Sequence, residues 1–389
     1  MARDQAALDG CAAALAGLPN MGPNRLTTIV RKWGFVEGWE LVRSGRIPPA
    51  KVMPRTSAEV QRAVIAEWVR AAAALEPRAV REAHRAAGIG IVTYGSDRFP
   101  SVLAADIEPP MVIFTMGDPE VLIGTRVGVV GTRRATGGGR QTAADIGHRL
   151  AAAGVRVVSG LALGIDGAAH QGALRATDDG APASAVGVVA TGLDVVYPTR
   201  HAELWRAIGR RGLLVSEWPL GTPPAKWRFP ARNRIIAALS DLLVVVESHA
   251  KGGALLTVDE AMQRDRPVLV VPGSVRSAAS EGTNELLVSG ATPVCRPDDI
   301  LRELDLSSCS RSNDQAGMGE GESQGEPPPA LDPGDGRLLD SIGWEPVALD
   351  TLAGRCGLEL GDLSLRLMRL EGDGRIRRTG STIEQVDIT

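Results

Sequence analysis

The chain changes character at Val127-Gly128-Val129-Val130-Gly131-Thr132-Arg133-Arg134-Ala135-Thr136-Gly137-Gly138-Gly139-Arg140. The apolar run at 127–130 is rich in β-branched residues and too short for a helix, and it does not alternate with polar residues. This is typical of a strand buried on both faces. A glycine- and arginine-rich turn follows, and a helical stretch begins at Thr142. This strand–turn–helix unit predicts a parallel sheet covered by helices.

The same unit repeats toward the C-terminus. Further short apolar runs lie at 155–158, 185–190, 213–215, 242–246 and 268–271. Helical stretches separate them, at 142–153, 166–176, 202–211 and 232–239. This regular alternation predicts an α/β fold with a doubly wound parallel sheet. Ligands of such sheets bind beyond the carboxyl ends of the strands, so a binding site is expected in the turns that follow the strands.

Four regions are expected along the chain. We expect residues 1–95 to form a small helical domain of the helix-hairpin-helix or SAM-like kind, and residues 96–305 to form the doubly wound sheet domain. Residues 306–334 are rich in Ser, Gly, Glu and Pro, which predicts a disordered linker. Residues 335–389 have the size of a winged-helix domain. That domain either binds a duplex through Arg366, Arg369 and the run 375–378, or docks a partner.

A turn between two N-terminal helical stretches has the sequence Leu18-Pro19-Asn20-Met21-Gly22-Pro23-Asn24-Arg25-Leu26. In helix-hairpin-helix modules, a turn of this kind presents backbone amides to a phosphate. Plain packing of two helices produces the same pattern, because Pro and Gly mark any tight turn. Both interpretations stay open at this point.

Composition excludes several classes of protein. The 389 residues carry a formal net charge of −3, unlike a histone-type polycation, but residues 126–235 hold 15 Lys and Arg against 7 Asp and Glu. This imbalance predicts one anion-binding face. The four cysteines form no C-x-x-C pair, so neither a zinc ribbon nor a disulfide framework is expected. Without a membrane-length apolar run or a signal-peptide pattern, we expect a soluble, cytoplasmic protein.

The turn at 131–140 lacks the glycine spacing of a dinucleotide fingerprint and the Gly-Lys-Ser/Thr of a P-loop. Its amides lie at the start of a helix, where the dipole favours an anion, and Arg133 can bind phosphate oxygens through its guanidinium. We therefore interpret Gly131, Thr132, Arg133 and Thr136 as an anion-binding turn. Flexible glycines with solvated arginines are the alternative.

The turn after the second apolar run contains Gly160, Asp166 and His170. Asp166 and His170 stand one helical turn apart, a spacing compatible with acid–base or metal chemistry. A structural role is favoured, in which Asp166 caps the helix and His170 packs beside it or forms a hydrogen bond with it. The five histidines show no paired metal-ligand spacing, so we expect no metal and no cofactor.

Cations and rings are densest at Lys226-Trp227-Arg228-Phe229-Pro230-Ala231-Arg232-Asn233-Arg234. Such a mixture can bind an unpaired strand, because the charges follow the phosphates while a ring stacks on a base. We expect this cluster to meet the turn at 131–133 at one edge of the sheet. Core packing of Trp227 beside a solvated arginine face is the alternative.

Together these segments resemble the bacterial DNA-processing protein A family (DprA, also called Smf). The resemblance is carried, in order, by 131–133, 159–170, Gly192-Leu193-Asp194 with Tyr197-Pro198, 229–240 and 271–274. It covers residues 100–295 closely and the flanking regions more loosely. The chain has Leu163 where the family usually has arginine, and Gly138 where it often has an aromatic residue. Either phosphates are held more weakly, or Arg134 or Arg140 compensates for the missing cation.

The resemblance implies an extended Rossmann-like domain that binds single-stranded DNA and self-associates as a homodimer. It also implies help in loading RecA recombinase onto incoming DNA during natural transformation, with protection of that DNA and displacement of single-strand-binding protein. The binding residues that it implies are Gly131, Thr132, Arg133, Gly160, Lys226, Phe229, Asn233 and Arg234. The residue patterns above add Thr136 and Arg232.

Two functions compete. The leading hypothesis is a non-catalytic single-strand binder in which phosphates are neutralised by cations and Phe229 stacks on a base. Its cations are Arg133, Lys226, Arg232 and Arg234. The alternative is a nucleotide-handling enzyme such as a nucleoside-monophosphate phosphoribohydrolase, because residues 252–260 are similar to that group's phosphate loop with its catalytic glutamate. Here the spacing is one residue longer and the third glycine is missing, which favours a structural role for Glu260.

A purely architectural adaptor is a third hypothesis, in which the linker and the tail carry the function. It would leave the cation–aromatic cluster at 226–234 without a role.

Overall fold

The computed structural model describes residues 2–304, 333–342, 347–356, 360–372, 376–379 and 382–385. The chain divides into two compact units, Met1–Ala316 and Gly317–Thr389, and each is described by itself. Nearly all of the expected linker at 306–334 lies outside the described residues. None of the described helices is both long and apolar enough to cross a membrane.

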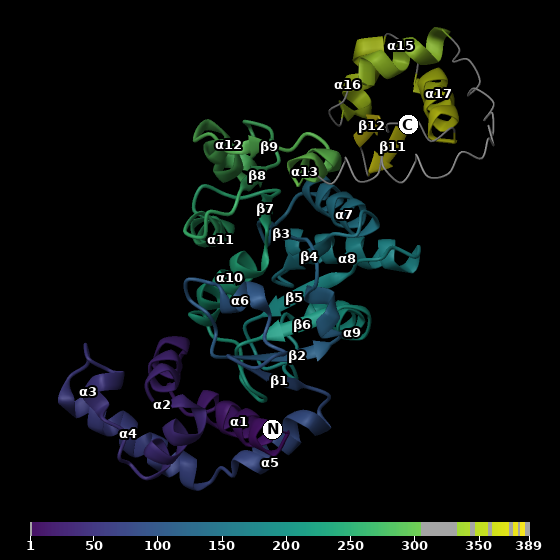
Figure 1. The fold of residues 1–389 in the computed structure, drawn as a ribbon. Coiled ribbons are helices and arrows are strands. Elements are labelled where there is room, and N and C mark those ends of the chain that lie inside the picture. Colours follow the sequence, from purple (N-terminus) through teal and green to yellow (C-terminus); the bar gives the residue numbers. More distant parts are fainter. Residues whose placement is uncertain are drawn as a thin grey trace. The chain divides into compact units, whose positions relative to one another are not determined.

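The first unit begins with helices that precede its sheet (Figure 1). They are α1 (Ala2–Ala16), α2 (Pro23–Arg43), α3 (Pro49–Val52), α4 (Ala58–Ala73) and α5 (Pro77–Ala86). Their core contains the buried rings of Trp39 and Trp68. The indole Nε1 of Trp68 donates to the Pro19 carbonyl, 2.7 Å away, and so fixes the turn between α1 and α2.

A nine-stranded sheet follows, in the order β1-β2-β6-β5-β4-β3-β7-β8-β9. Its strands are β1 (Gly90–Thr93), β2 (Val112–Gly117), β3 (Arg126–Val130), β4 (Arg156–Ser159), β5 (Ala185–Val189), β6 (Leu213–Ser216), β7 (Leu242–Val245), β8 (Val268–Val270) and β9 (Thr292–Pro293). The six predicted apolar runs all form strands and pair in parallel. The α/β prediction is therefore confirmed.

The sequence predicts a parallel sheet, but two of the strand pairs in the structure are antiparallel. β2 runs antiparallel to both β1 and β6. A parallel β1–β2 pair would need a crossover helix, but the segment between these strands holds only the one-turn helix α6 (Ser101–Ala104). β1 also begins before residue 95, the expected end of the helical domain.

Helices cover both faces of the sheet (Figure 1). They are α7 (Gly137–Ala152), α8 (Ile165–Asp178), α9 (Ala202–Arg211), α10 (Arg228–Leu239), α11 (Gly253–Met262), α12 (Glu281–Val288) and α13 (Pro297–Glu303). Alternate strand residues face two different cores: Val244 packs on the side of α7 and α8, and Val245 on the side of α10 and α11. Burial on both faces explains why the strands read as unbroken apolar runs.

The strand order locates the crevice in which such sheets bind ligands. β3 is flanked by β4 on one side and by β7 on the other, and the connections leave in opposite directions from this point. The turn after β3 and the loop after β7 therefore open a crevice at the carboxyl edge of the sheet. Residues 131–134 line one side of this crevice, and His249, Lys251, Gly252 and Gly253 line the other.

The second unit has the helices and antiparallel sheet expected for a winged helix. Its elements are α15 (Pro333–Ile342), β10 (Val347–Ala348), α16 (Leu349–Cys356), α17 (Leu360–Gly372), β11 (Ile376–Thr379) and β12 (Thr382–Gln385), with strand order β10-β12-β11. Arg366 and Arg369, expected as duplex contacts, form ion pairs with the buried carboxylate of Asp335. In the run 375–378, no side chain but that of Ile376 is described.

The close packing of α7 against α8 depends on glycine. A Cβ atom built on Gly172 would lie 1.9 Å from the carbonyl oxygen of Ala144 on the neighbouring helix, so no larger residue fits without separating the helices. Gly137, in the first turn of α7, has open space around it.

We predict that Gly172→Ala lowers the free energy of unfolding by about 1–3 kcal/mol, because the two helices must separate to admit the methyl group. Gly137→Ala is the matched control and leaves stability unchanged or slightly higher, since alanine favours a helix. Thermal unfolding followed by circular dichroism measures both variants. Equal melting temperatures for Gly172→Ala and the unsubstituted protein would contradict the packing described.

Candidate nucleic-acid interface

A cavity of about 670 Å³ opens at the crevice between β3 and β7. Predicted site residues that line it are Gly131, Thr132, Arg133, Lys226, Phe229, Arg232 and Asn233. Gly160 lines a smaller adjoining cavity that shares Arg133, Phe229 and Arg232 with the first. The sequence prediction that the turn after β3 and the 226–234 segment meet is confirmed.

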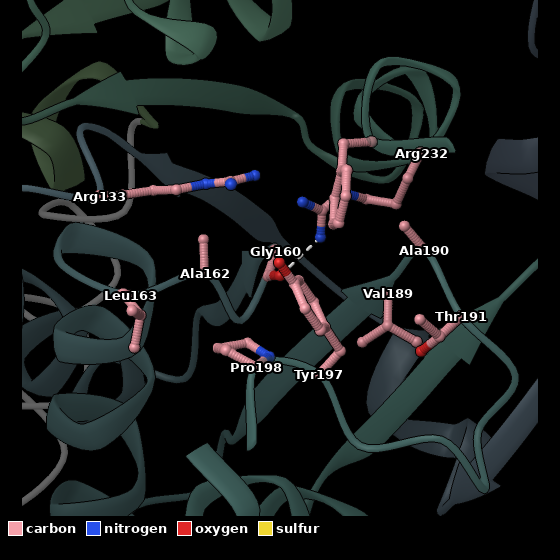
Figure 2. A pocket seen from close by; sticks show the side chains of 11 residues that line it. Arg133, Gly160, Ala162, Leu163, Val189, Ala190, Thr191, Tyr197, Pro198 and Arg232 are labelled. Carbon is pink, nitrogen blue, oxygen red and sulfur yellow. Dashed lines mark hydrogen bonds between the residues drawn. The ribbon is translucent and has the colours of Figure 1, made fainter. Parts of the chain in front are cut away.

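Arg133 and Phe229 are in direct contact. The Arg133 guanidinium carbon lies 5.1 Å from the centroid of the Phe229 ring, which is a cation–π contact. Phe229 is half-buried, and the ring of Tyr197 lies 5.6 Å from it. Figure 2 shows Arg133 extending across the smaller cavity toward Arg232, with Tyr197 and Pro198 on the other side. The cavity therefore combines an accessible ring with an exposed guanidinium.

Arg232 forms part of the wall of this cavity and is not an exposed arm. Its guanidinium donates to the carbonyl oxygens of Gly160 and Val188, and the residue is 6% exposed. Burial lowers the pKa of Arg232 to about 10, with a smaller contribution from the like charge of Arg133. Its Nε has no hydrogen-bond partner within the described part of the chain. Arg232 thus brings positive charge to the site from within the protein.

The structure does not bring Arg234 to this cavity. Its guanidinium forms a buried ion pair with Glu217 and donates to the Glu108 carbonyl, 2.7 Å away. Burial raises the pKa of Glu217, and Arg234 opposes that rise. The expectation that Arg234 binds phosphate is therefore unsupported by its position, because its charge is already neutralised by a carboxylate.

The anion expected at the start of α7 is supplied by the protein. The buried carboxylate of Glu247 accepts hydrogen bonds from the backbone amide and the hydroxyl of Thr136, at 2.9 and 2.6 Å. A Cβ on Gly139 would lie 2.3 Å from the same carboxyl group. This glycine therefore makes room for Glu247, and Thr136 serves as a helix cap and a partner of Glu247. Thr136 does not line the cavity.

A second helix start, not expected from the sequence, does line the cavity. Gly252 and Gly253 begin α11 there, with no side-chain cap at Gly252, and the exposed Lys251 and the ring of His249 lie beside them. In the sequence, the signal for it is the Lys-Gly-Gly turn that follows an apolar run, which is also the segment on which the enzyme hypothesis rests.

Arg134 and Arg140, the two candidates to replace the cation that the family usually has at position 163, differ in their position relative to the cavity. Arg134 is exposed and lines the large cavity. Arg140 does not line it, and its guanidinium donates to the Ala135 carbonyl. Leu163 lines the smaller cavity. Of the two candidates, only Arg134 is therefore placed to replace a cation lost at Leu163.

Asp166 and His170 have structural partners. The Asp166 carboxylate accepts from the Gly160 amide at 3.1 Å, and burial raises its pKa. The residue that caps α8 is Gly164, so the expected cap at Asp166 is wrong. His170 is completely buried, its ring contacts the Val186 carbonyl, and burial lowers its pKa to about 3. Asp166 holds the turn that carries Gly160 in place.

Glu260, the glutamate of the enzyme hypothesis, is engaged elsewhere. Its carboxylate lies 2.6 Å from Arg264, which also binds Asp106, and it lines a different groove. In the described part of the chain, no group of three or more His, Cys, Asp or Glu residues is arranged to hold a metal ion.

Comparison with known proteins identifies the family of the chain. The family model described as DNA recombination-mediator protein A matches residues 90–305, and the DprA winged helix domain matches 322–380. The chain is 36% identical to DNA processing protein DprA of Bacillus subtilis over 226 residues, 58% of this chain and 74% of that protein. It is 31% identical to Protein Smf of Synechocystis over 323 residues, 76% and 80% of the two chains.

Two solved structures are also similar. DNA processing protein A from Streptococcus pneumoniae aligns with a TM-score of 0.60 at 28% identity, over 75% of this chain and 95% of that one. The Helicobacter pylori protein, whose structure is described as giving insight into a unique single-stranded DNA binding mode, aligns with a TM-score of 0.50 at 29% identity, over 56% and 95%. The chain belongs to the DNA recombination-mediator protein A family, known as DprA or Smf.

Proposed function

We propose that this protein binds single-stranded DNA as a non-catalytic DNA-processing protein. The observation that carries the proposal is the contact of Arg133 with Phe229 inside an open cavity that Lys226 also lines. A nucleotide offers a phosphate and a flat base, and this pair of side chains offers a matching cation and ring.

The exposed charges around the cavity supply the affinity. Arg133, Arg134, Lys226 and Lys251 line it and are exposed, and the start of α11 adds backbone amides. Among the residues that the structure describes, Asp166 is the only acid that lines the cavity, and it is buried. Phosphates that enter the cavity release counterions, so affinity falls as salt rises and depends little on sequence.

The shape of the cavity favours an unpaired strand. Phe229 is half-buried and contacts both Arg133 and Tyr197, so its ring can receive only a base that is not stacked within a duplex. A duplex would meet the cations at the rim but not the ring. The description of the Helicobacter pylori relative supports the same ligand.

The family is described as a recombination mediator. This description, together with the resemblance found in the sequence, supports an extension of the proposal to protein partners. We propose that the protein protects incoming single strands in the cytoplasm and helps load RecA onto them as single-strand-binding protein is displaced. As a homodimer it would hold one strand at two cavities, which raises avidity. The enzyme alternative is not retained, because Glu260 is bound by Arg264 outside the cavity.

Lys226→Ala and Phe229→Ala each weaken binding of a fluorescein-labelled oligothymidylate by about tenfold, the first through a lost phosphate contact and the second through lost stacking. Fluorescence anisotropy measures the dissociation constants, with a duplex of equal length as the second ligand. Arg206→Ala, an exposed cation on α9, is the matched control and leaves binding unchanged. Unaltered single-strand affinity in the Lys226/Phe229 double variant would refute the site.

Arg133 and Arg234 are predicted to behave differently. Arg133→Ala reduces the slope of log affinity against log salt by about 0.7, the value for one phosphate contact on a single strand. Arg234→Ala leaves Glu217 buried without its partner, so it lowers the free energy of unfolding by about 3–5 kcal/mol. Salt titrations and chemical denaturation separate the two effects. A lower salt slope in folded Arg234→Ala would show that this arginine does contact phosphate.

The absence of catalysis is tested with nucleoside monophosphates. We expect no release of free base when the protein is incubated with each of them, because Glu260 is held by Arg264. Chromatography of the reaction mixture detects the base. Base release that is lost in Glu260→Gln would establish the enzyme alternative.

A further inference from the structure

The 226–230 segment separates two hollows in the protein surface, the cavity described above and a groove, and its residues line both of them. Lys226 and Phe229 line the cavity described above, whereas Trp227 and Arg228 line a separate groove of about 1000 Å³. Pro230 lines both. The two hollows therefore share a rim, and a chain-like ligand that leaves the first over Pro230 enters the second.

Trp227 is an exposed ring held in one orientation. It is 53% exposed, and its other side packs edge-on against the buried Trp218, with ring centroids 5.2 Å apart. The Arg228 guanidinium lies over both rings, 4.8 Å from Trp218 and 5.0 Å from Trp227, and donates to the Pro223 carbonyl. These contacts fix the indole before any ligand arrives, so stacking on it requires little further ordering.

The facing wall of the groove comes from the N-terminal helices. The turn at 16–25 lines it, and this turn is anchored by the Trp68 hydrogen bond to Pro19 and by Arg25, which donates to the Asn20 carbonyl at 2.6 Å. This is the turn for which the sequence left phosphate binding open. Both walls belong to the first unit.

The charges of this groove nearly cancel. Arg234 is paired with Glu217, and Glu260 with Arg264. The remaining charged residues on the lining are Arg25 and Arg228 against the exposed Glu108. In the described part of the chain, the first cavity is lined by exposed cations and by no exposed acid. A ligand in the groove is therefore held mainly by its flat apolar faces, and its binding depends weakly on salt.

We propose that the strand bound in the first cavity continues across Pro230 into this groove and stacks a base on Trp227. This inference rests on the proposed single-strand binding, and it adds a second subsite that recognises bases more than phosphates. Continuity with the first cavity favours a single strand over a protein segment as the occupant. The N-terminal helices then contribute one wall of the path of the strand.

The test compares strand lengths. Trp227→Ala is titrated by fluorescence anisotropy with labelled oligothymidylates of about two and about fifteen nucleotides. The longer strand has enough bases to fill the cavity and the groove at once, whereas the shorter strand is expected to occupy the cavity alone, where the exposed cations lie. We expect this substitution to weaken binding of the longer strand by about fivefold or more. The affinity for the shorter strand is expected to stay unchanged. The salt slope stays unchanged, because no phosphate contact is removed.

Two matched variants complete the design. Trp227→Phe keeps a stacking ring and restores most of the affinity for the longer strand. Ile123→Ala, at an exposed apolar residue outside both the cavity and the groove, has no effect. Equal loss for both strand lengths would place Trp227 in the first cavity and overturn the second subsite. Unchanged affinity for both strand lengths would also refute the proposal, and would indicate that the groove binds another ligand, such as a protein segment. If the unsubstituted protein bound neither strand, the proposed function itself would fail.

Discussion

The parallel pairing of β3 with β7 is the constraint on which the rest of the structure depends. Residues 127–130 pair with 242–245, and both strands are buried on their two faces. A slip of one residue would exchange the side chains that face the two cores, so burial fixes the register. The turn that carries Arg133 and the loop that carries Lys251 therefore begin at neighbouring points of one edge. Buried valines and leucines thus position the cations of the site.

Much of this arrangement could be predicted from the sequence. The apolar runs predicted the strands, because a strand buried on both faces is apolar along its whole length. Ligands of parallel sheets bind at the carboxyl ends of the strands, and this rule predicted that Arg133 and Phe229 meet there. The antiparallel edge was missed because β1 and β2 precede the regular strand–helix alternation. Their direction depends on pairing across the sheet, which local pattern does not encode.

The roles of the arginines could not be predicted, because they depend on distant partners. Arg232 and Arg234 stand two residues apart on α10, yet one lines the cavity and the other is bound by Glu217, on the loop after β6. The same holds for Thr136, whose neighbour Glu247 comes from the loop after β7. Local sequence shows which residues are charged. Only the fold shows which charges are already neutralised.

In our account, exposed cations bind the phosphates of the strand and aromatic rings stack on its bases. Phe229 lies among cations, whereas Trp227 lies in a groove whose charges nearly cancel. A crystal structure of the protein with a bound oligothymidylate tests the central claim most directly. Our account predicts one base lying flat on Phe229, with phosphate oxygens within hydrogen-bonding distance of Lys226 and Arg133. A strand bound at a different face, with Phe229 free of any base, would contradict it.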